Sequence, residues 1–477
     1  MKKSRVKIEN DLLGRIGALA DEAEIPAFVV GGYVRDLLLG REVKDMDILV
    51  LGQGIAFAER VAKALHRTNL ATFPKFGTAM LQLDDGKIEF VGARKESYTK
   101  DSRKPVVETG TLDEDLSRRD FTVNAVAVSL NRETWGDVTD PFKGREDLKK
   151  KLLRTPLDPE ETFDDDPLRV MRAMRFAAQL DFEVAPAILR AARTMRQRLS
   201  IVSQERISEE ILKLMASRRP SVGWKLMQET GVVEIVFPEI HQLSGVEQRK
   251  EYHHKDVFFH TLKVVDNICE MTENVWLRMA ALLHDVAKPK TKAFKEGTGW
   301  TFHGHEEIGA RMVKPIFRRM KFPLEHVPYV EKLVRLHLRP MALVDHDVTD
   351  SAVRRLLFEA GPDIDDLMTL CRADITSRNP KLVKQVRQNY DRVAEKMKVV
   401  EERDRMRNWQ PALRGDEIMR VCGIQEGPSV GDLKQMVVDA VLDGHIPNEH
   451  DAALEYLLRI KDEVLSKKGT KSSTTRK

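Results

Sequence analysis

The sequence predicts a mixed α/β N-terminal domain followed by a long, largely all-α region. Up to about residue 150, short apolar runs closed by glycine and segments of alternating polarity indicate strands. Beyond that point, stretches of helical periodicity follow one another. The chain has 477 residues, of which 42% are hydrophobic and 32% charged, so it is long enough to bury cores in roughly three domains.

The N-terminal domain shows strands, a helix and a hairpin. Ala27–Val30 and Asp47–Leu51 are apolar runs that end in glycine, and Ile55–His66 has the spacing of an amphipathic helix. Thr78–Leu83 and Lys87–Val91 alternate around an Asp-Asp-Gly turn, as the two strands of a hairpin do. These elements predict a small α/β domain.

From residue 151 onward only helices are expected. Their apolar residues recur at helical spacing. The stretches are 167–180, 186–198, 204–216, 221–229, 260–272, 275–287, 305–320, 324–337, 350–359, 363–376, 380–402, 431–443 and 449–466.

The composition argues against several classes of protein. No run of 18 or more apolar residues occurs, so no membrane-spanning helix is expected, and the first ten residues lack the apolar core of a signal peptide. The three cysteines are odd in number and far apart, so we expect no disulfide framework and a cytoplasmic location. The net charge of +4 does not by itself indicate a nucleic-acid partner.

A first candidate site begins in residues 28–52. Gly31 and Gly32 stand between a strand and a helix, where a triphosphate can approach free backbone N–H groups. An ordinary strand–turn–helix glycine pair is the alternative. Asp45 and Asp47 share one face of a strand, because alternate residues point the same way. Neighbouring carboxylates repel unless a cation lies between them, and their hard oxygen atoms favour Mg²⁺.

Further polar residues extend this candidate site. Two-metal phosphoryl transfer usually uses a third carboxylate, and Glu89 is the candidate, with an exposed strand position as the alternative. Arg118 and Arg119, beside Asp120, can clamp phosphates, and Asn124 can hydrogen-bond a sugar or a phosphate. A surface cluster of ion pairs is the alternative for this group.

Asp166 and Arg169 lie three residues apart on one face of an expected helix, and Arg172 continues that face. A carboxylate and a guanidinium held side by side can hydrogen-bond the edge of a base. However, Asp166 before Pro167 is also typical of a helix N-cap, and a carboxylate used for capping would not read a base. The residues alone leave both interpretations open.

A second candidate site lies in the all-α region, where His and Asp recur at helical positions. A lone histidine on an apolar helix is usually a core residue, but six such residues are harder to explain in that way. Imidazole and carboxylate together suit a divalent transition metal or Mg²⁺. The residues are His260, His284, Asp285, His305, His337 and Asp374.

The first group of motifs resembles the class II tRNA nucleotidyltransferases, the bacterial CCA-adding enzymes and their poly(A) polymerase relatives. The resemblance covers about residues 25–240. Its six motifs, in chain order, are GGYVRDLLLG, DMD, RRDFTVNA, DPFKGREDL, DDPLR and SQERISEEILKLM. The second group resembles the HD phosphohydrolase superfamily, whose ligands would be His260, His284, Asp285 and Asp374. His305 and His337 could complete a second metal site or bind phosphate.

The first resemblance implies roles for particular residues at the nucleotide. Asp45 and Asp47 would hold Mg²⁺. Triphosphate binding would fall to Gly31, Gly32 and Arg35, and contacts to the sugar and phosphates to Arg118, Asp120 and Asn124. Asp166 and Arg169 would act as a protein template for the incoming base, with Arg172 nearby.

The two resemblances also imply a division of the chain. The segments would be a nucleotidyltransferase head at 1–150, a helical neck and body for base selection and RNA binding at 151–245, an HD-type metal domain at 246–395, a helical C-terminal region at 396–466 and a disordered basic tail at 467–477. The HD metal is not identified by the sequence, nor is the oligomeric state.

The implied activity is addition or repair of the 3′-terminal CCA at the acceptor end of tRNA, from CTP and ATP. A poly(A) polymerase and an enzyme that adds only CC or only A share the same fold and stay open. A metal-dependent phosphohydrolase with a vestigial transferase head is the alternative from another class.

Overall fold

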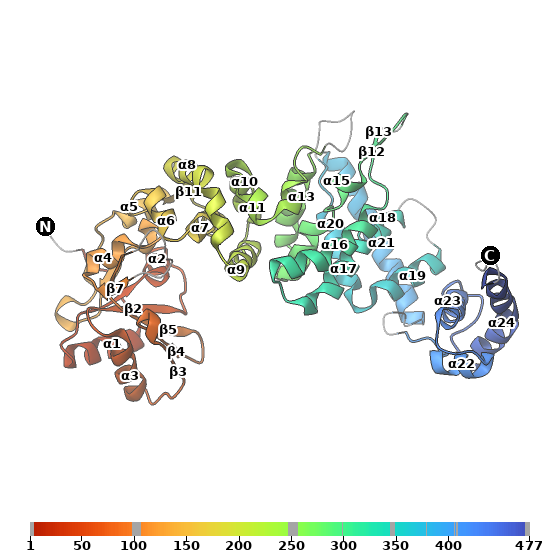
Figure 1. Ribbon diagram of the computed structural model, residues 1–477, viewed down its shortest axis with the longest axis horizontal. Coiled ribbons are helices and arrows are strands. Elements are labelled where there is room, and N and C mark those ends of the chain that lie inside the picture. The colour runs from red at the N-terminus through yellow and green to blue at the C-terminus, as the bar shows by residue number, and fades with distance from the viewer. Residues whose placement is uncertain are drawn as a thin grey trace. The chain divides into compact units, whose positions relative to one another are not determined.

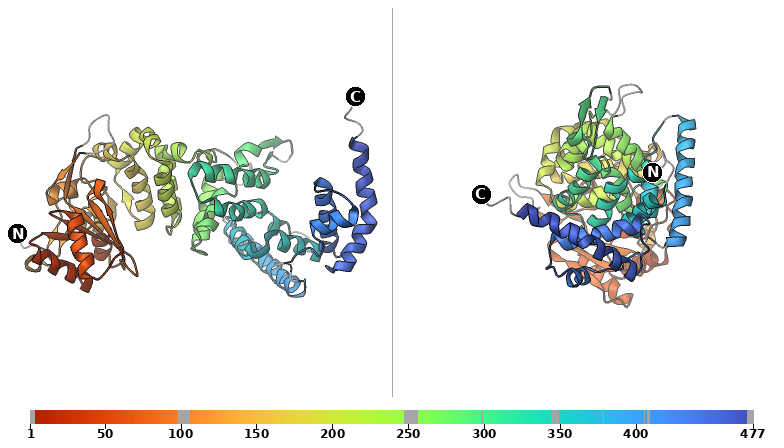
Figure 2. Two further views of the ribbon diagram at one scale, coloured as in Figure 1. Left: turned by 60° about the horizontal axis from the view of Figure 1, so that its bottom comes forward. Right: turned by 90° about the vertical axis from the view of Figure 1, so that its right-hand side faces the viewer.

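The computed structural model describes residues 4–97, 106–246, 256–297, 299–343, 349–377, 379–404, 406 and 409–472. The chain forms two compact units, Met1–His241 and Gln242–Lys477, which are traced by colour in Figures 1 and 2. The predicted fold class is confirmed, because a mixed sheet in the first unit is followed by a mostly helical remainder.

The head contains a seven-stranded sheet in the order β3-β4-β5-β2-β1-β8-β9. Strands β2 and β5 run parallel, and the other neighbouring strands of this sheet pair antiparallel. The bounds are Ala27–Val30 for β1, Met46–Val50 for β2, Leu70–Phe73 for β3, Thr78–Gln82 for β4, Lys87–Gly92 for β5, Ala127–Ser129 for β8 and Val138–Thr139 for β9.

The two faces of the sheet carry different residues, because side chains alternate along each strand. Helices α1 (Asp11–Glu22) and α3 (Gly54–Ala64) contribute to a core that contains Val29 and Ile48, and Figure 1 shows both helices together beside the strands. The opposite face carries Leu49 and packs against α4 (Leu112–Ser117). Asp47 and Glu89 have the parity of this second face.

The rest of the first unit is helical apart from two short strands. Its helices are α5 (Gly144–Lys150), α6 (Pro159–Asp165), α7 (Leu168–Leu180), α8 (Pro186–Met195), α9 (Gln204–Met215), α10 (Pro220–Thr230), α11 (Val232–Val236) and α12 (Pro238–His241). Strands β10 (Leu152–Leu153) and β11 (Glu183–Val184) pair in parallel, although no strand is expected there from the sequence. With two residues each, they are too short to show a period of two.

The second unit is built from helices. They are α13 (Val257–Cys269), α14 (Val275–Leu283), α15 (Lys288–Thr291), α16 (His305–Met320), α17 (Val327–Leu336), α18 (Arg339–Ala342), α19 (Asp350–Ala360), α20 (Ile364–Ala373), α21 (Pro380–Asp404), α22 (Gly415–Cys422), α23 (Pro428–Leu442) and α24 (His450–Ser472). The last three share a small hydrophobic core of their own.

Two features of this unit differ from the helices expected from the sequence. An antiparallel hairpin, β12 (Ala293–Lys295) and β13 (Gly299–Thr301), interrupts the helices where only helices are expected. Helix α24 continues to Ser472, past the expected end at 466, and residues 473–477 of the expected tail lie outside the described residues. Within the described ranges, no helix has the length and apolar composition needed to cross a bilayer.

Candidate active site and metal centre

A cavity of about 360 Å³ opens on the face of the head sheet that carries Asp47. Asp47 on β2 and Glu89 on β5 are direct neighbours in the parallel register, so their carboxylates stand side by side. The lining residues are Val30, Asp47, Ile48, Thr78, Glu89, Val91, Asp115, Arg118, Arg119, Asp120, Asp166, Arg169, Arg172 and Arg206. Most of the residues predicted for this site therefore meet in one cavity.

Gly31 lets the backbone pass close to this cavity. Its φ of 71° lies in the left-handed region, and a Cβ atom there would stand 2.7 Å from Asp47 Oδ2 and 3.1 Å from a terminal nitrogen of Arg119. A side chain at this position would push against both groups. Both groups are side chains and could move aside, but their movement would displace groups that line the cavity.

We expect Gly31→Ala to lower nucleotide incorporation by about a hundredfold, the cost that a misplacement of about 1 Å can have at an active site. The positive φ should also lower the free energy of unfolding by about 1–3 kcal/mol. Primer extension and urea unfolding would measure the two effects.

Gly40→Ala is the matched control. Gly40 has a φ of 67°, but no atom of the described residues lies within 4 Å of its added Cβ. This variant should share the backbone cost and keep full incorporation. Equal losses of activity in both variants would show that crowding at Asp47 has no part in the effect.

The charge on Asp47 is unfavourable in the folded protein. Burial raises the pKa of Asp47, the charge of Arg119 lowers it, and repulsion by Glu89 and Asp45 raises it further. Paired carboxylates that face a cavity are the hard oxygen donors that suit a divalent cation, and a cation there would relieve the repulsion. Asp47 and Glu89 therefore fit a metal site.

Asp45 and Gly32 lie less directly at the cavity. Asp45 is exposed, precedes the first residue of β2, and its Oδ1 accepts a hydrogen bond from the backbone N of Lys87 at 3.1 Å. It is not among the described residues that line the cavity. Gly32 begins α2 (Gly32–Leu38), next to the Arg35 guanidinium. The roles predicted for both residues stay predictions.

Arg118 and Arg119 are held by a residue that the sequence reasoning missed. Asp115 on α4 is buried, and its two carboxylate oxygens face Arg118 Nε at 3.3 Å and Arg119 Nη2 at 3.1 Å. The spacing of three and four residues, which favours side-chain contact on a helix, was the signal available. Asp115 aims both cations at the cavity.

Asp120 is the centre of a buried polar network. Its Oδ1 accepts a hydrogen bond from Asn124 Nδ2 at 2.9 Å, and its Oδ2 accepts from Arg172 Nη2 at 2.6 Å. Burial would raise the pKa of Asp120, but the charge of Arg172 and the hydrogen bonds from Asn124 and Arg172 outweigh it and hold the pKa at about 2. Asp120 is thus a fixed anion that orients its partners.

The network continues in both directions. Asn124 Oδ1 accepts a hydrogen bond from buried Arg35 at 2.9 Å. On the other side, Arg172 Nη1 lies 3.8 Å from Glu210 of α9, which also pairs with Arg175 at 2.5 Å. The network therefore links the glycine motif of the head to two helices of the neck. Glu210 was not singled out from the sequence.

Asp166 does cap helix α7, as one interpretation of the sequence expects. Its Oδ1 accepts from the backbone N of Leu168 at 3.2 Å, and its Oδ2 accepts from Arg206 at 2.7 Å. Arg169 donates to the carbonyl oxygens of Thr162 and Arg118. Because two carboxylate oxygens offer about four acceptor positions, capping does not exclude a contact with a base.

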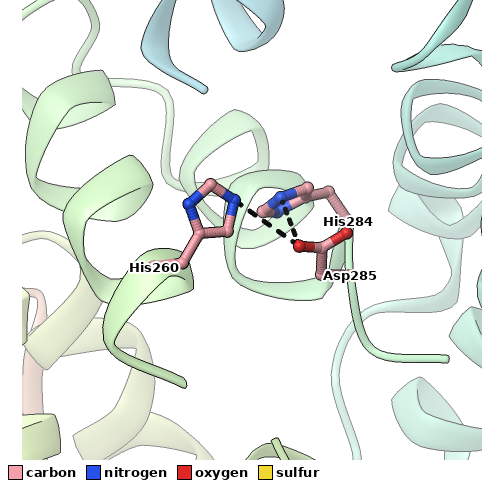
Figure 3. A group of neighbouring side chains, drawn as sticks. All are labelled: His260, His284 and Asp285. Carbon is pink, nitrogen blue, oxygen red and sulfur yellow. Dashed lines mark ion pairs between the residues drawn. The ribbon is translucent and has the colours of Figure 1, made fainter. Parts of the chain in front are cut away.

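The second unit brings all six predicted His and Asp residues into one cluster. Two overlapping groups have ligand atoms that lie within 4.8 Å of one another: His260, His284 and Asp285 in one, and Asp285, His305 and His337 in the other. Figure 3 shows the rings of His260 and His284 directed at the carboxylate of Asp285. Asp374 Oδ1 lies 3.0 Å from His260 Nε2 and 3.7 Å from His284 Nε2.

The histidines are oriented by their other ring nitrogen. The Nδ1 atoms of His284, His305 and His337 lie 2.6–2.7 Å from the carbonyl oxygens of the residues three positions before them, and this fixes Nδ1 as the donor. In the neutral ring, each Nε2 therefore keeps a lone pair that can bind a proton or a metal ion. A hydrogen bond at the other ring nitrogen typically orients a histidine that binds a metal.

Several atoms at the centre of the cluster lack a well-formed hydrogen bond. Among the described residues, Nε2 of His284, Nε2 of His305 and Oδ1 of Asp374 are buried and make no hydrogen bond of good geometry, although each lies 3.0–3.4 Å from another polar atom of the cluster. Buried polar atoms are rarely left in this state, so their convergence needs an explanation. A divalent cation supplies one, because it accepts lone pairs from all three.

The charges at the cluster also favour a cation. Burial would lower the pKa of His284, but the attraction of Asp285 outweighs it and raises the pKa to about 9. Burial would raise the pKa of Asp374, but its contact with His260 and the charge of His284 hold it at about 2. Burial itself lowers the pKa of His337 to about 3, so this ring is neutral, as a ligand must be.

Lys288 is a further residue that the sequence reasoning missed. Its Nζ lies 2.7 Å from Asp285 Oδ2, three residues away. A cation this close would compete with a metal for one lone pair, but it can also attract the phosphate of a substrate. The i, i+3 spacing within HDVAK was the available signal.

Taken together, a carboxylate pair and arginines around a sheet-face cavity, and a separate His/Asp cluster among helices, define a nucleotidyltransferase with an attached HD domain. Residues 27–154 match the poly A polymerase head domain, 181–243 match the probable RNA and SrmB-binding site of polymerase A, and 257–379 match the HD domain. Domains of the first and third kinds generally use divalent metal ions.

The chain belongs to the tRNA nucleotidyltransferase and poly(A) polymerase family. It is 31% identical over 437 residues to a CC-adding tRNA nucleotidyltransferase of Thermus thermophilus, covering 89% of this chain and 92% of the relative. An A-adding tRNA nucleotidyltransferase of Deinococcus radiodurans is 31% identical, with 72% and 78% covered. A multifunctional CCA protein of Nitrosococcus oceani is 34% identical, with 65% and 74% covered.

Solved structures agree on the fold. An apo CCA-adding enzyme superposes with a TM-score of 0.62 at 22% identity, covering 95% of this chain and 96% of the other. A tRNA nucleotidyltransferase complexed with a primer tRNA and an incoming ATP analogue superposes with a TM-score of 0.58 at 24% identity, covering 80% and 98%.

Proposed function

We propose that this chain adds or repairs the 3′-terminal CCA of tRNA, using CTP, ATP and Mg²⁺ at the cavity of the first unit. The observation that carries the proposal is the pairing of Asp47 and Glu89 on neighbouring strands beside five arginines that line the same cavity. The names of the relatives, which include CC-adding, A-adding and multifunctional CCA proteins, support tRNA as the acceptor.

In the proposed reaction, the RNA 3′-hydroxyl oxygen bonds to the α-phosphorus, the bond to the bridging oxygen breaks, and pyrophosphate leaves while the hydroxyl proton passes to solvent. Mg²⁺ held by Asp47, with Asp45 and Glu89, supplies charge neutralisation. Arg118 and Arg119, aimed by Asp115, hold the phosphates. Arg35, Asn124 and Arg172 keep these groups in register around Asp120.

We keep the division of the chain inferred from the sequence as part of this proposal. Residues 1–150 carry the transfer chemistry, 151–245 select the base and bind RNA, 246–395 hold the HD metal, and 396–466 form the C-terminal region. Residues 247–255, beside one of these boundaries, lie outside the described residues.

The test is extension of a tRNA that lacks its CCA end, with CTP alone, ATP alone, and both. Two C residues followed by one A and then a stop is the expected result. Addition of C only, addition of A only to a CC end, or a long A tail would each identify a different transferase. Failure to incorporate any nucleotide would contradict the transferase proposal.

The dual position of Asp166 gives a specific prediction. Asp166→Asn keeps a side-chain oxygen that can cap α7, since Asn and Asp are similarly good N-caps. The substitution removes the charge, and we expect the preference between CTP and ATP to fall by about ten- to a hundredfold, the worth of a charged hydrogen bond. Misincorporation by Asp166→Asn on a defined primer would measure it.

Thermal unfolding separates the two interpretations of Asp166. If the residue only caps the helix, Asp166→Asn should match the parent in both stability and selectivity, and Asp166→Ala should lose only stability. Arg169→Ala provides the partner test, because a template for the base needs both groups.

We propose in addition that the HD domain hydrolyses phosphoesters of the class of 2′,3′-cyclic phosphates or 2′-phosphates. The observation behind this is the convergence of buried Nε2 and Oδ1 atoms that make no hydrogen bond of good geometry. A bound divalent ion supplies Lewis acidity. Hydrolysis adds the hydroxyl of water to phosphorus and its proton to the departing oxygen, and Lys288 lies where it can attract the substrate phosphate.

A further inference from the structure

A short basic hairpin leaves the HD cluster and returns to it. We define it as residues 288–302, which hold four lysines and one glutamate and contain α15, β12 and β13. Figure 1 shows β12 and β13 extending from the helices of their unit next to α15. The hairpin contains none of the six His and Asp residues of the cluster, so metal binding does not explain its presence.

Both ends of the basic hairpin contact the metal cluster. At its start, Lys288 Nζ lies 2.7 Å from Asp285 Oδ2. At its end, the carbonyl oxygen of Phe302 accepts a hydrogen bond from His305 Nδ1 at 2.7 Å. Lys288 Nζ also lies over the Phe302 ring, 5.6 Å from its centroid. A ligand on the hairpin would therefore be held beside the cluster.

The face of the hairpin combines aromatic rings with cations. Phe294 and Trp300 are a cross-strand pair whose rings meet edge to face with centroids 5.2 Å apart. Lys292 Nζ lies 4.3 Å from the centroid of Trp300, and Lys295 is exposed. Stacking rings beside positive charges are what proteins use to bind single-stranded nucleic acid.

The rings of the hairpin pack on each other but not into a core. Phe294 is 56% exposed, and every described residue of the two strands is exposed or only half-buried. Contact between the two rings can help to hold a two-stranded hairpin, which is marginal in water, but neither ring is buried in a core. Their exposure next to a phosphoester site points to a ligand with bases and phosphates.

We propose that the basic hairpin binds the single-stranded nucleotides that precede an RNA 3′ end and so presents that end to the HD cluster. The bases stack on Phe294 and Trp300, and Lys292 and Lys295 contact phosphates. This rests on the proposed hydrolase function. It names the substrate of that function as the end of an RNA rather than a free nucleotide.

Two substrates with the same scissile bond test the proposal. One is adenosine 2′,3′-cyclic phosphate, and the other is a hexanucleotide that ends in the same group. In the full chain loaded with a divalent metal, Phe294→Ala/Trp300→Ala should raise KM for the hexanucleotide about tenfold or more, since stacking contributes substantially for each base. Turnover of the mononucleotide should not change, which also shows that the cluster is intact.

Two further variants separate stacking from charge. Phe294→Trp should retain the KM of the parent, because it keeps a ring. Lys292→Gln/Lys295→Gln should reduce the slope of log KM against log salt concentration by about 1.4. Each phosphate contact on a single strand contributes about 0.7 to this slope. Lys314→Gln/Lys321→Gln, which removes two exposed lysines of α16 and its C-terminal cap, is the matched control and should leave the slope unchanged.

The outcomes keep the two proposals apart. An unchanged KM for the hexanucleotide in the double alanine variant would overturn the role of the hairpin. Metal-dependent turnover of the mononucleotide would still support the hydrolase proposal. If the parent hydrolyses neither substrate, the hydrolase proposal fails. Photo-crosslinking of a thiouridine-containing RNA then tests whether the hairpin binds RNA. Labelling of residues 288–302 would support RNA binding by the hairpin, and the absence of labelling there would overturn it.

Discussion

Replacing Asp47 by Asn should lower nucleotide incorporation by about a thousandfold, while the fold becomes no less stable. Loss of a metal ligand removes several kcal/mol of charge stabilisation, and about 4 kcal/mol corresponds to a thousandfold. Stability should hold because burial and the charges of Glu89 and Asp45 raise the pKa of Asp47. A raised pKa in a folded acid means that its ionised form costs stability above that pKa, and Asn removes this cost.

Thermal unfolding with and without Mg²⁺ would reveal both effects. Mg²⁺ should raise the melting temperature of the parent more than that of Asp47→Asn, which keeps only the HD cluster as a metal site. Asp84→Asn is the matched control, because Asp84 pairs with Arg67 on the surface of the same sheet, where an ion pair contributes little. Full incorporation by Asp47→Asn would rule out the transferase site as drawn.

Replacing Asp285 by Asn should abolish hydrolysis at the HD cluster and release its metal. Asp285 belongs to both candidate ligand groups, with Oδ2 toward His260 and His284 and Oδ1 toward His305. We expect at least about a thousandfold loss of turnover of adenosine 2′,3′-cyclic phosphate, by the same reasoning on metal-assisted charge stabilisation. Elemental analysis of the purified protein would report the metal.

CCA addition should survive in Asp285→Asn, because the transferase cavity belongs to the other compact unit. This persistence also shows that the variant folds. His326→Gln serves as the control, since His326 stacks on Trp276 outside the two ligand groups. Metal retained at the parental level in Asp285→Asn would contradict the assignment of this carboxylate.

Much of the transferase site could be anticipated because local periodicity decides it. Strand alternation places Asp47 and Glu89 on one face, and the register between β2 and β5 makes them neighbours. The same rule places Asp45 on the face of Asp47, and the role of Asp45 stays a prediction. Because β2 begins one residue after Asp45, alternation did not reveal that its carboxylate also accepts a hydrogen bond from the backbone N of Lys87. Strand ends are set by pairing with distant residues, which alternation does not reveal.

The supporting residues were harder to foresee. Arg206 and Glu210 reach the site from α9, and their partners Asp166 and Arg172 are 40 and 38 positions away in the sequence. Contacts of this range depend on how helices pack, and a single sequence carries no direct signal of it. The basic hairpin was missed for another reason, since its strands of three residues are too short for a periodic pattern.

The buried polar network from Arg35 through Asp120 to Glu210 limits where the gene of such a protein can be divided or recombined. A fragment that ends at residue 150 would lose Arg172, the ion-pair partner of Asp120, and removing one partner of a buried ion pair typically costs about 3–5 kcal/mol. That is a large part of the roughly 5–15 kcal/mol that holds a typical domain together. Recombination that exchanges heads between related genes should therefore succeed only when the crossover falls beyond α9. The exchanged segment then includes Arg172 and Glu210, which pair with the buried charges of the head.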